Sequence, residues 1–183
     1  MVNYIANAVQ LHRVGANALT LNLLNRVAAM QPVQPEEIAP LTRARRRIVE
    51  TVSRLARDAN FADQVLDAYG HRCAVTRAQL KLLDAAHILP VGADGSTDLV
   101  TNGIALSPTY HRAFDHGLIY LDARLRMVIN PTRVEYLRRL NLDAGLAAFS
   151  EPLGNMIHLP ANPAQRPSPN IVRRANSFRR IAA

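Results

Sequence analysis

The stretch LLDAAHILPVGADGSTDLVTNGIALSPTYHRAFDHG, residues 82–117, decides the fold of this chain of 183 residues. It begins with an apolar run at 82–90 that is long enough for one buried strand and carries His87 near its end. A loop rich in turn formers follows, and residues 102–107 then read as a returning strand, which Asn102 enters just before a glycine. The pattern predicts a hairpin of two antiparallel strands with a long irregular connection.

A helix is expected directly after the hairpin. Ser107 can cap it, a proline occupies its first position, and Gly117 can end it. On this helix His111 and Asp115 stand four residues apart and therefore share one face. The expected fold class is α+β, with one histidine on the hairpin and a second on the helix.

The order of these residues resembles that of the His-Asn-His (HNH) family of endonucleases, which fold as a β-hairpin and a helix that grip one metal ion. Restriction-type members carry segments similar to AHI (86–88), NGIAL (102–106) and HRAFD (111–115), and the stretch 65–76 looks like the sequence that leads into their hairpin. The resemblance covers roughly residues 60 to 130. It implies a ββα-metal core and endonuclease activity, and it assigns His111 to the metal and Asn102 to orienting the base and the loop.

Hydrolysis of a phosphodiester requires an activated water, neutralised charge on the phosphate oxygens and a stabilised leaving oxygen. A neutral imidazole, with an unperturbed pKa of about 6.5, can accept the proton of that water, and His87 is the predicted general base. A divalent cation can meet the other two requirements, and oxygen and imidazole ligands suit Mg²⁺, Mn²⁺ or a related ion. Together with the resemblance, this makes His87, Asn102 and His111 the candidate catalytic residues.

A carboxylate ligand is the point at which this sequence departs from the family pattern. Many members have Asp, Glu or His immediately before the base, whereas this chain has Ala86 there. Asp84 shares a strand face with Ala86 but would lie about 7 Å from it, at ~3.3 Å per residue. Asp115, one helical turn beyond His111, is the rival ligand, because some relatives use a residue at that offset. Both carboxylates remain candidates, and both can contribute.

The charge of the chain agrees with a polyanionic partner. The formal net charge is +8, from 22 basic and 14 acidic residues, and all but one of the cations are arginine, whose planar fork pairs with phosphate. Such contacts hold the nucleic-acid backbone without reading bases, and Arg45, Arg46 and Arg112 are the candidate contacts. Aromatic residues make up only 5% of the chain, which disfavours a stacking platform for single strands and favours double-stranded DNA. The plainer interpretation of each basic cluster is a solvated helix face.

Three parts are expected along the chain. Residues 1–58 would form a helical arm for dimerisation or DNA contact, and residues 59–150 would form the HNH nuclease domain. The tail, 151–183, carries arginines and four prolines between 160 and 169, so it is expected to be extended.

Elements outside the central stretch are expected from apolar periodicity and from turn residues. Helical sequence is expected in 3–29, 42–57, 61–69 and 132–140, a proline-marked linker at 32–40, and a second antiparallel strand pair at 118–121 and 126–129.

The single cysteine, Cys73, excludes an intrachain disulfide and a CxxC zinc clamp. No structural zinc is therefore expected, and Cys73 should be a buried small side chain. Neither a signal peptide nor a run of about 18 apolar residues is found, so we expect a cytoplasmic protein without membrane contact. The alanine- and arginine-rich composition favours a bacterial source.

The predicted function is metal-dependent cleavage of double-stranded DNA, in restriction or host defence. One base and one metal site nick a single strand, so cutting both strands requires a homodimer or two successive events. Two alternatives remain open. One is a nucleic-acid-binding module with a degenerate HNH site, which Ala86 suggests, and the other is an interaction protein whose basic faces contact RNA or an acidic partner.

Overall fold

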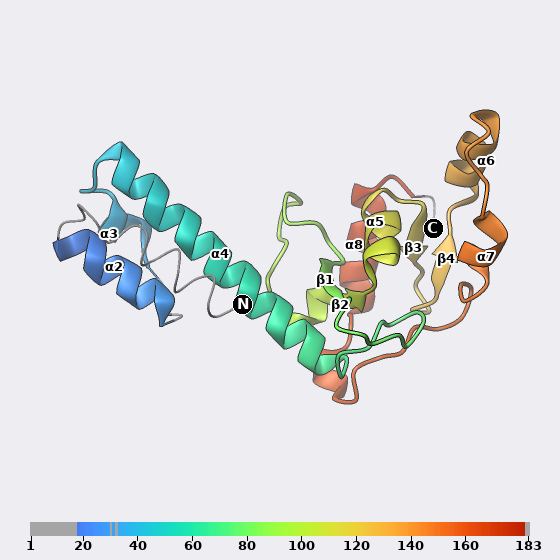
Figure 1. The fold of residues 1–183 in the computed structure, drawn as a ribbon, viewed down its shortest axis with the longest axis horizontal. Helices are drawn as coiled ribbons and strands as arrows, with labels where there is room; N and C mark the ends of the chain where they lie inside the picture. The colour runs from blue at the N-terminus through green and yellow to red at the C-terminus, as the bar shows by residue number, and fades with distance from the viewer. Residues whose placement is uncertain (1–17, 30, 32, 182–183) are drawn as a thin grey trace. The chain divides into compact units, whose positions relative to one another are not determined.

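The protein has an α+β architecture with two small antiparallel sheets (Figure 1). The computed structural model describes residues 18–29, 31 and 33–181. The chain divides into two compact units, Met1–Asn60 and Phe61–Ala183. In the part of the chain that the structure describes, no helix is long and apolar enough to cross a membrane.

The first unit is helical. It contains α2 (Ala18–Ala28), α3 (Pro35–Ile38) and most of α4 (Arg43–Ala68). Its core is formed by buried aliphatic side chains from these helices and the turn before α4: Leu23, Leu24, Val27, Leu41, Val49, Val52 and Ala59. The expected helix at 3–29 is confirmed for α2, and residues 3–17 lie outside the described residues.

Two expectations for this unit are wrong. The linker at 32–40 contains the short helix α3, because Pro35 occupies its first turn, where no amide donor is needed. The helices expected at 42–57 and 61–69 are one continuous helix, α4. Residues 58–60 contain neither proline nor glycine, and Ala59 continues the buried face seven residues after Val52, so nothing ends the helix there.

The predicted hairpin is confirmed in the second unit. Strand β1 (Asp84–His87) pairs antiparallel with β2 (Gly103–Leu106), so that Asp84 lies opposite Leu106 and His87 opposite Gly103. The 3₁₀ turn η1 (Val100–Asn102) leads into β2. Asn102 therefore ends this turn and does not enter the strand.

Helix α5 (Pro108–Asp115) follows β2, as predicted. Ser107 occupies the N-cap position with an extended backbone, although its side chain makes no capping hydrogen bond. His116 ends the helix, and Gly117 follows at φ 68°, a left-handed conformation that favours glycine. Pro108 in the first turn and Gly117 after the last set the length of the helix that carries His111.

A second strand pair and two helices follow α5. Strands β3 (Ile119–Leu121) and β4 (Met127–Ile129) pair antiparallel, and α6 (Pro131–Arg139) begins after an Asn130 cap, all close to the predicted ranges. A short helix, α7 (Leu146–Ser150), comes next.

The tail is not extended throughout, which corrects the prediction. It contains the 3₁₀ turn η2 (Pro163–Gln165) and the ten-residue helix α8 (Pro169–Phe178). The Ser168 hydroxyl accepts a hydrogen bond from the Ile171 amide at 3.2 Å, so a serine cap followed by proline starts a helix here. Val172 and Ala175 on its apolar face are buried in the core of the second unit.

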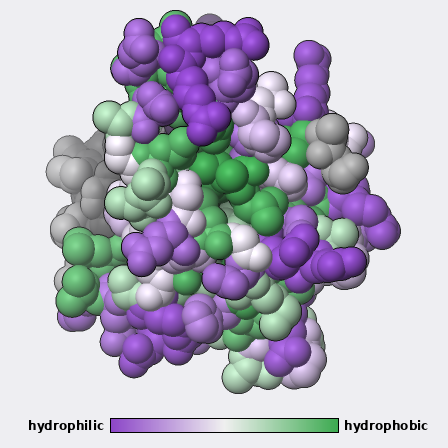
Figure 2. All heavy atoms as spheres, turned by 90° about the vertical axis from the view of Figure 1, so that its right-hand side faces the viewer, coloured by the Kyte–Doolittle hydropathy of each residue, from purple (hydrophilic) through white to green (hydrophobic). Residues whose placement is uncertain are grey.

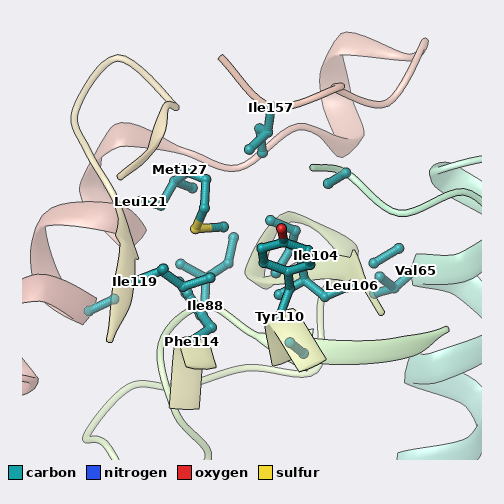
Figure 3. Close-up of a cluster of buried hydrophobic side chains, with 14 of the residues drawn as sticks. Val65, Ile88, Ile104, Leu106, Tyr110, Phe114, Ile119, Leu121, Met127 and Ile157 are labelled. Carbon is teal, nitrogen blue, oxygen red and sulfur yellow. The ribbon is translucent and has the colours of Figure 1, made fainter. Parts of the chain in front are cut away.

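One hydrophobic core joins the hairpin, α5, the second strand pair and α8 (Figure 3). Its largest fully buried side chains are Phe114, Ile88, Ile104, Leu106, Ile119, Leu121 and Met127. Each contributes about 1.5–3 kcal/mol when it leaves water, so the hairpin and helix are held against each other by many such contacts. Cys73 is fully buried in the same core, as predicted. Hydrophobic side chains also reach the surface: on the face shown in Figure 2 they form a band among hydrophilic ones.

Candidate active site

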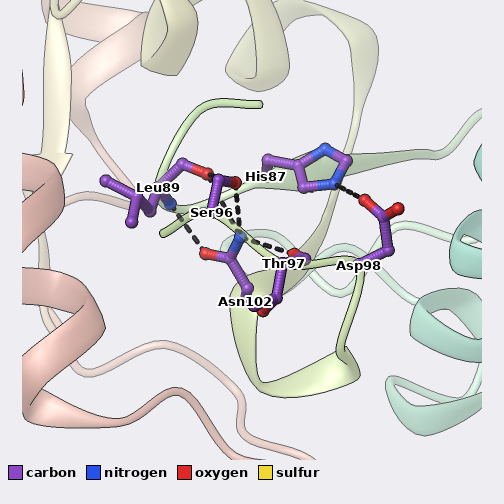
Figure 4. Close-up of polar contacts among 6 residues, drawn as sticks. All are labelled: His87, Leu89, Ser96, Thr97, Asp98 and Asn102. Carbon is purple, nitrogen blue, oxygen red and sulfur yellow. Dashed lines mark hydrogen bonds and ion pairs between the residues drawn. The ribbon is translucent and has the colours of Figure 1, made fainter. Parts of the chain in front are cut away.

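His87 is the last residue of β1, and two neighbours fix its imidazole. Its Nε2 lies 3.0 Å from Oδ1 of Asp98, in the loop that connects the strands (Figure 4). The ring stacks on Phe61 of α4, with centroids 3.9 Å apart and planes 13° apart. The His87 side chain is 17% exposed, so it reaches solvent over a small area. The imidazole is therefore held at the surface of the hairpin in a defined orientation.

The partner of His87 decides which ring nitrogen can act as a base. A carboxylate only accepts hydrogen bonds, so Nε2 of His87 donates its proton to Asp98. In the neutral ring, Nδ1 then carries the lone pair, and it lies on the side of the ring away from Asp98 (Figure 4). This arrangement presents Nδ1 as the atom that can take a proton from water.

The lack of a side chain at Gly103 leaves room for α4 to pack close to His87. A Cβ atom at this position would lie 2.2 Å from Cγ2 of Val65 and 3.1 Å from Cζ of Phe61. The Tyr69 hydroxyl donates to the Gly103 carbonyl at 3.4 Å, and burial raises the pKa of Tyr69 well above its ordinary value, so it stays protonated. A glycine here lets Phe61 reach the His87 ring.

Asn102 holds the loop between the strands. Its side chain is 1% exposed and makes a two-way contact with Leu89: Oδ1 accepts from the Leu89 amide at 2.8 Å, and Nδ2 donates to the Leu89 carbonyl at 3.1 Å. Nδ2 also donates to the Thr97 carbonyl at 2.8 Å and lies 3.3 Å from the Ser96 hydroxyl (Figure 4). Asn102 thus ties the loop at Leu89, two residues after His87, and at Thr97, immediately before Asp98.

His111 lies between two carboxylates. Its Nδ1 is 3.1 Å from Oδ2 of Asp84 on β1, and its Nε2 is 3.2 Å from Oδ2 of Asp115 one turn along α5. The His111 side chain is 25% exposed, and the carboxylates are 49% and 54% exposed, so the group is open to solvent. A neutral imidazole has one N–H and can donate to only one carboxylate. Both carboxylates are satisfied when the ring is protonated or when a cation lies between an oxygen and a ring nitrogen.

This donor set fits a hard divalent cation. Imidazole nitrogen and carboxylate oxygen are ligands of Mg²⁺ and Mn²⁺, and Mg²⁺ in particular is held by one or two carboxylates, water and substrate phosphate. Among residues 18–29, 31 and 33–181, no group of three or more His, Cys, Asp or Glu side chains is placed so that it could hold a metal ion. His111 with either Asp84 or Asp115 would therefore make a two-ligand site that needs water and substrate to complete it.

The predicted site residues thus fall into three contact groups. His111 contacts both candidate carboxylates, Asp84 and Asp115. His87 contacts Asp98 instead. Asn102 contacts the loop and does not contact the His87 ring. Asp84 and His87 lie at opposite ends of β1, three residues apart and hence ~10 Å along an ideal strand.

Sequence reasoning missed Asp98 and Phe61. Asp98 occurs in a run of turn-forming residues, and nothing in that run indicates which polar side chain turns back toward the strand. Phe61 lies 26 positions before His87, and its apolar side chain was expected only to support a helix.

The three arginines that were predicted to contact nucleic acid differ in exposure and in their local partners. Arg112 is exposed next to His111 on α5. Arg45 is half-buried, and Arg46 donates to the Ala39 carbonyl at 2.7 Å, which caps the turn before α4. Arg46 therefore has a local structural partner in addition to any contact with a ligand.

Comparison with known proteins identifies the core of this arrangement. Residues 73–122 match the family model described as HNH endonuclease. This segment therefore belongs to the HNH endonuclease family, and it contains the hairpin and α5 with Asp84, His87, Asn102 and His111.

One solved structure of a similar chain is that of the "Modification dependent TagI restriction endonuclease". It is 21% identical, with a TM-score of 0.43, and the match covers 66% of this chain and 37% of that one. The present chain thus corresponds to little more than a third of that enzyme. No curated protein matches this chain.

Proposed function

We propose that this protein is a metal-dependent endonuclease that hydrolyses phosphodiester bonds of double-stranded DNA. The observation that carries the proposal is the contrast between the two histidines on the HNH core. His87 donates through one nitrogen and has a lone pair on the other, whereas His111 faces a carboxylate at each nitrogen. The first environment suits a general base, and the second suits a metal ligand.

In the proposed reaction, Nδ1 of His87 takes a proton from the attacking water. Asp98 holds the ring through Nε2 and stabilises the imidazolium that forms, while Phe61 prevents the ring from rotating. Asn102 maintains the loop that carries Asp98. A divalent ion, when bound, supplies charge neutralisation at the phosphate and stabilises the leaving oxygen. His111 with either Asp84 or Asp115 would hold that ion.

The arginines of α4 are the proposed backbone contacts. Arg43, Arg47, Arg54 and Arg57 are exposed and recur at helical spacing along one face. Val49 and Val52, which are buried, lie on the opposite face. This arginine stripe refines the sequence prediction, since it replaces Arg45 and Arg46 as the main contact surface, with Arg112 next to the site. Planar guanidinium groups in a row suit the phosphates of a duplex.

We place this activity in restriction or host defence, because the motifs are similar to those of restriction-type HNH nucleases. With one base and one metal site, a single chain would nick one strand. Cleavage of both strands would then need a second copy of the chain or a second event.

A plasmid assay tests the proposal. Supercoiled plasmid is incubated with the protein and Mg²⁺, Mn²⁺ or EDTA, and the open-circular product is measured. We expect nicking with a divalent ion, none with EDTA, and DNA binding that weakens steeply as salt rises. A preparation that retards DNA under all conditions but never nicks it would overturn the enzyme assignment.

A protein that binds DNA but never nicks it would be a nucleic-acid-binding module with a degenerate site. It has one observation in its favour: a protonated His111 would satisfy Asp84 and Asp115 without a metal, as a double ion pair. The two candidates differ in whether a divalent ion changes the outcome, because the module would bind DNA equally well with the ion and with EDTA.

A further inference from the structure

We propose that Arg179, in the turn after α8, is a positioning residue that fixes the base-bearing end of β1 relative to the metal-side helix α5. This inference rests on the proposed nuclease function. Arg179 belongs to a pair of adjacent arginines, Arg179 and Arg180, near the end of the given sequence. The structure turns the Arg179 side chain inward, toward the residues that flank the two histidines.

The contacts of Arg179 bridge two elements far apart in the sequence. Its Nη1 donates to the carbonyl of Ile88, the residue after His87, at 2.6 Å. Its guanidinium carbon lies 4.5 Å from the centre of the Phe114 ring, a cation–π geometry. Phe114 precedes Asp115 on α5 and is 1% exposed. One side chain therefore touches the end of β1 and the helix that carries His111.

The Arg179 guanidinium is placed in an environment that a simple surface arginine would not occupy. Its Nη2 is buried and has no hydrogen-bond partner among the described residues. Burial lowers the pKa of Arg179, and the nearby Asp115 carboxylate opposes that effect. Burying an arginine is costly, and the contacts of Arg179 with Ile88 and Phe114 offset part of that cost.

Other side chains of α8 anchor the same region. Arg174 donates to the Asp94 carbonyl, next to Gly95, whose φ of 65° favours glycine. Asn176 is buried and donates to the Leu121 carbonyl of β3 at 2.9 Å. Asn176 thus fixes α8 to β3. Arg174 of α8 and Arg179 in the turn after it reach the carbonyls of Asp94 and Ile88, within the segment that connects His87 to Asp98.

The expected role follows from this geometry. If Arg179 loses its contact with Ile88, the chain immediately after His87 gains freedom, and the distance from the base to the His111 site is less well defined. Small displacements of a base relative to the phosphate slow the chemical step while leaving DNA affinity intact. The exposed neighbour Arg180 provides a matched control, because its replacement removes the same charge one residue away.

The test compares Arg179→Met, Arg179→Lys and Arg180→Met in the full chain. We measure single-turnover nicking at saturating DNA and Mg²⁺, DNA affinity, and hydrogen exchange of residues 88–98. Arg179→Met should nick on the order of 10- to 100-fold more slowly, at unchanged DNA affinity. The backbone amides of residues 88–98 should exchange hydrogen faster in this variant than in the wild type. Arg179→Lys should recover part of the rate, because lysine keeps a cation and a donor but not the planar stack. Arg180→Met should match the wild type in rate and loop exchange.

Two results would overturn the inference: wild-type nicking by Arg179→Met, or equal losses of DNA affinity in Arg179→Met and Arg180→Met. If Arg179→Met does not fold, Arg179→Lys decides through the same rate and exchange measurements. If the wild-type protein itself never nicks DNA, the proposed function fails, yet hydrogen exchange still decides whether Arg179 braces the loop: unchanged exchange in both Arg179 variants would refute the brace.

Discussion

The two histidines of the HNH core stand in opposite environments although both face carboxylates. His87 has one carboxylate, Asp98, and an aromatic ring, Phe61, which leave Nδ1 for a substrate water. His111 has a carboxylate at each nitrogen and no ring stacked on it among the described residues. In the proposed mechanism, the number of carboxylates around each ring separates the proton acceptor, His87, from the metal ligand, His111.

Replacing His87 by alanine should have the largest effect. The variant loses the proton acceptor but keeps His111, Asp84 and Asp115, so nicking should fall by ~10²–10⁴-fold while DNA binding persists. Plasmid nicking with a gel-shift assay in parallel measures both. Undiminished nicking by this variant would refute His87 as the base.

Replacing the carboxylates of His111 should change the metal requirement. We expect Asp84→Asn and Asp115→Asn to raise the Mn²⁺ concentration for half-maximal nicking, on the order of 10-fold or more for the carboxylate that binds the ion. The DNA affinity should stay constant. A titration of the nicking rate with Mn²⁺ identifies which carboxylate binds the ion. If the titration is unchanged in both variants, the ion does not bind at His111.

Asp98→Asn should slow nicking by about 10-fold without changing the metal titration. The asparagine can present its amide group to Nε2 of His87, and the ring can then adopt the tautomer that places the proton on Nδ1. The same titration as above provides the measurement. If Asp98→Asn instead raises the Mn²⁺ requirement without changing the maximal rate, Asp98 acts on the metal site and not on the His87 base.

The smallest effect on the histidines themselves is expected from Asn102→Ala, which acts through the loop. The substitution leaves the Leu89 amide without its partner in a buried position and removes a part-buried hydrogen bond to the Thr97 carbonyl, at a cost of about 1–3 kcal/mol in the free energy of unfolding. Chemical denaturation measures it. Ser96→Ala is the control, since it removes only the partly buried contacts of the Ser96 hydroxyl with Leu89 and Asn102 and should cost less.

The spacing of residues along one helix was enough to predict the contact between site residues on that helix. His111 and Asp115 lie four residues apart on α5, and the structure confirms that they contact each other. Asp84 was placed on a strand near the helix, but the sequence could not choose between it and Asp115, because the choice depends on how β1 packs against α5. The structure places both next to His111.

Contacts that depend on the path of a loop or on distant packing were not predictable. The partner of His87 lies in an irregular loop of turn formers, where side-chain direction follows no period. Helix α8 was missed because prolines before it suggested an extended tail, although Ser168 and Pro169 are a helix start signal. The inward turn of Arg179 follows from the docking of α8, which local sequence does not encode.

The most direct test of the central claim is Mn²⁺ binding, followed by electron paramagnetic resonance, in His87→Ala and His111→Ala without DNA. We expect His87→Ala to bind Mn²⁺ as the wild type does and His111→Ala to lose Mn²⁺ binding, although both variants nick DNA far more slowly. Loss of Mn²⁺ binding in His87→Ala together with its retention in His111→Ala would contradict the assignment of the two histidines.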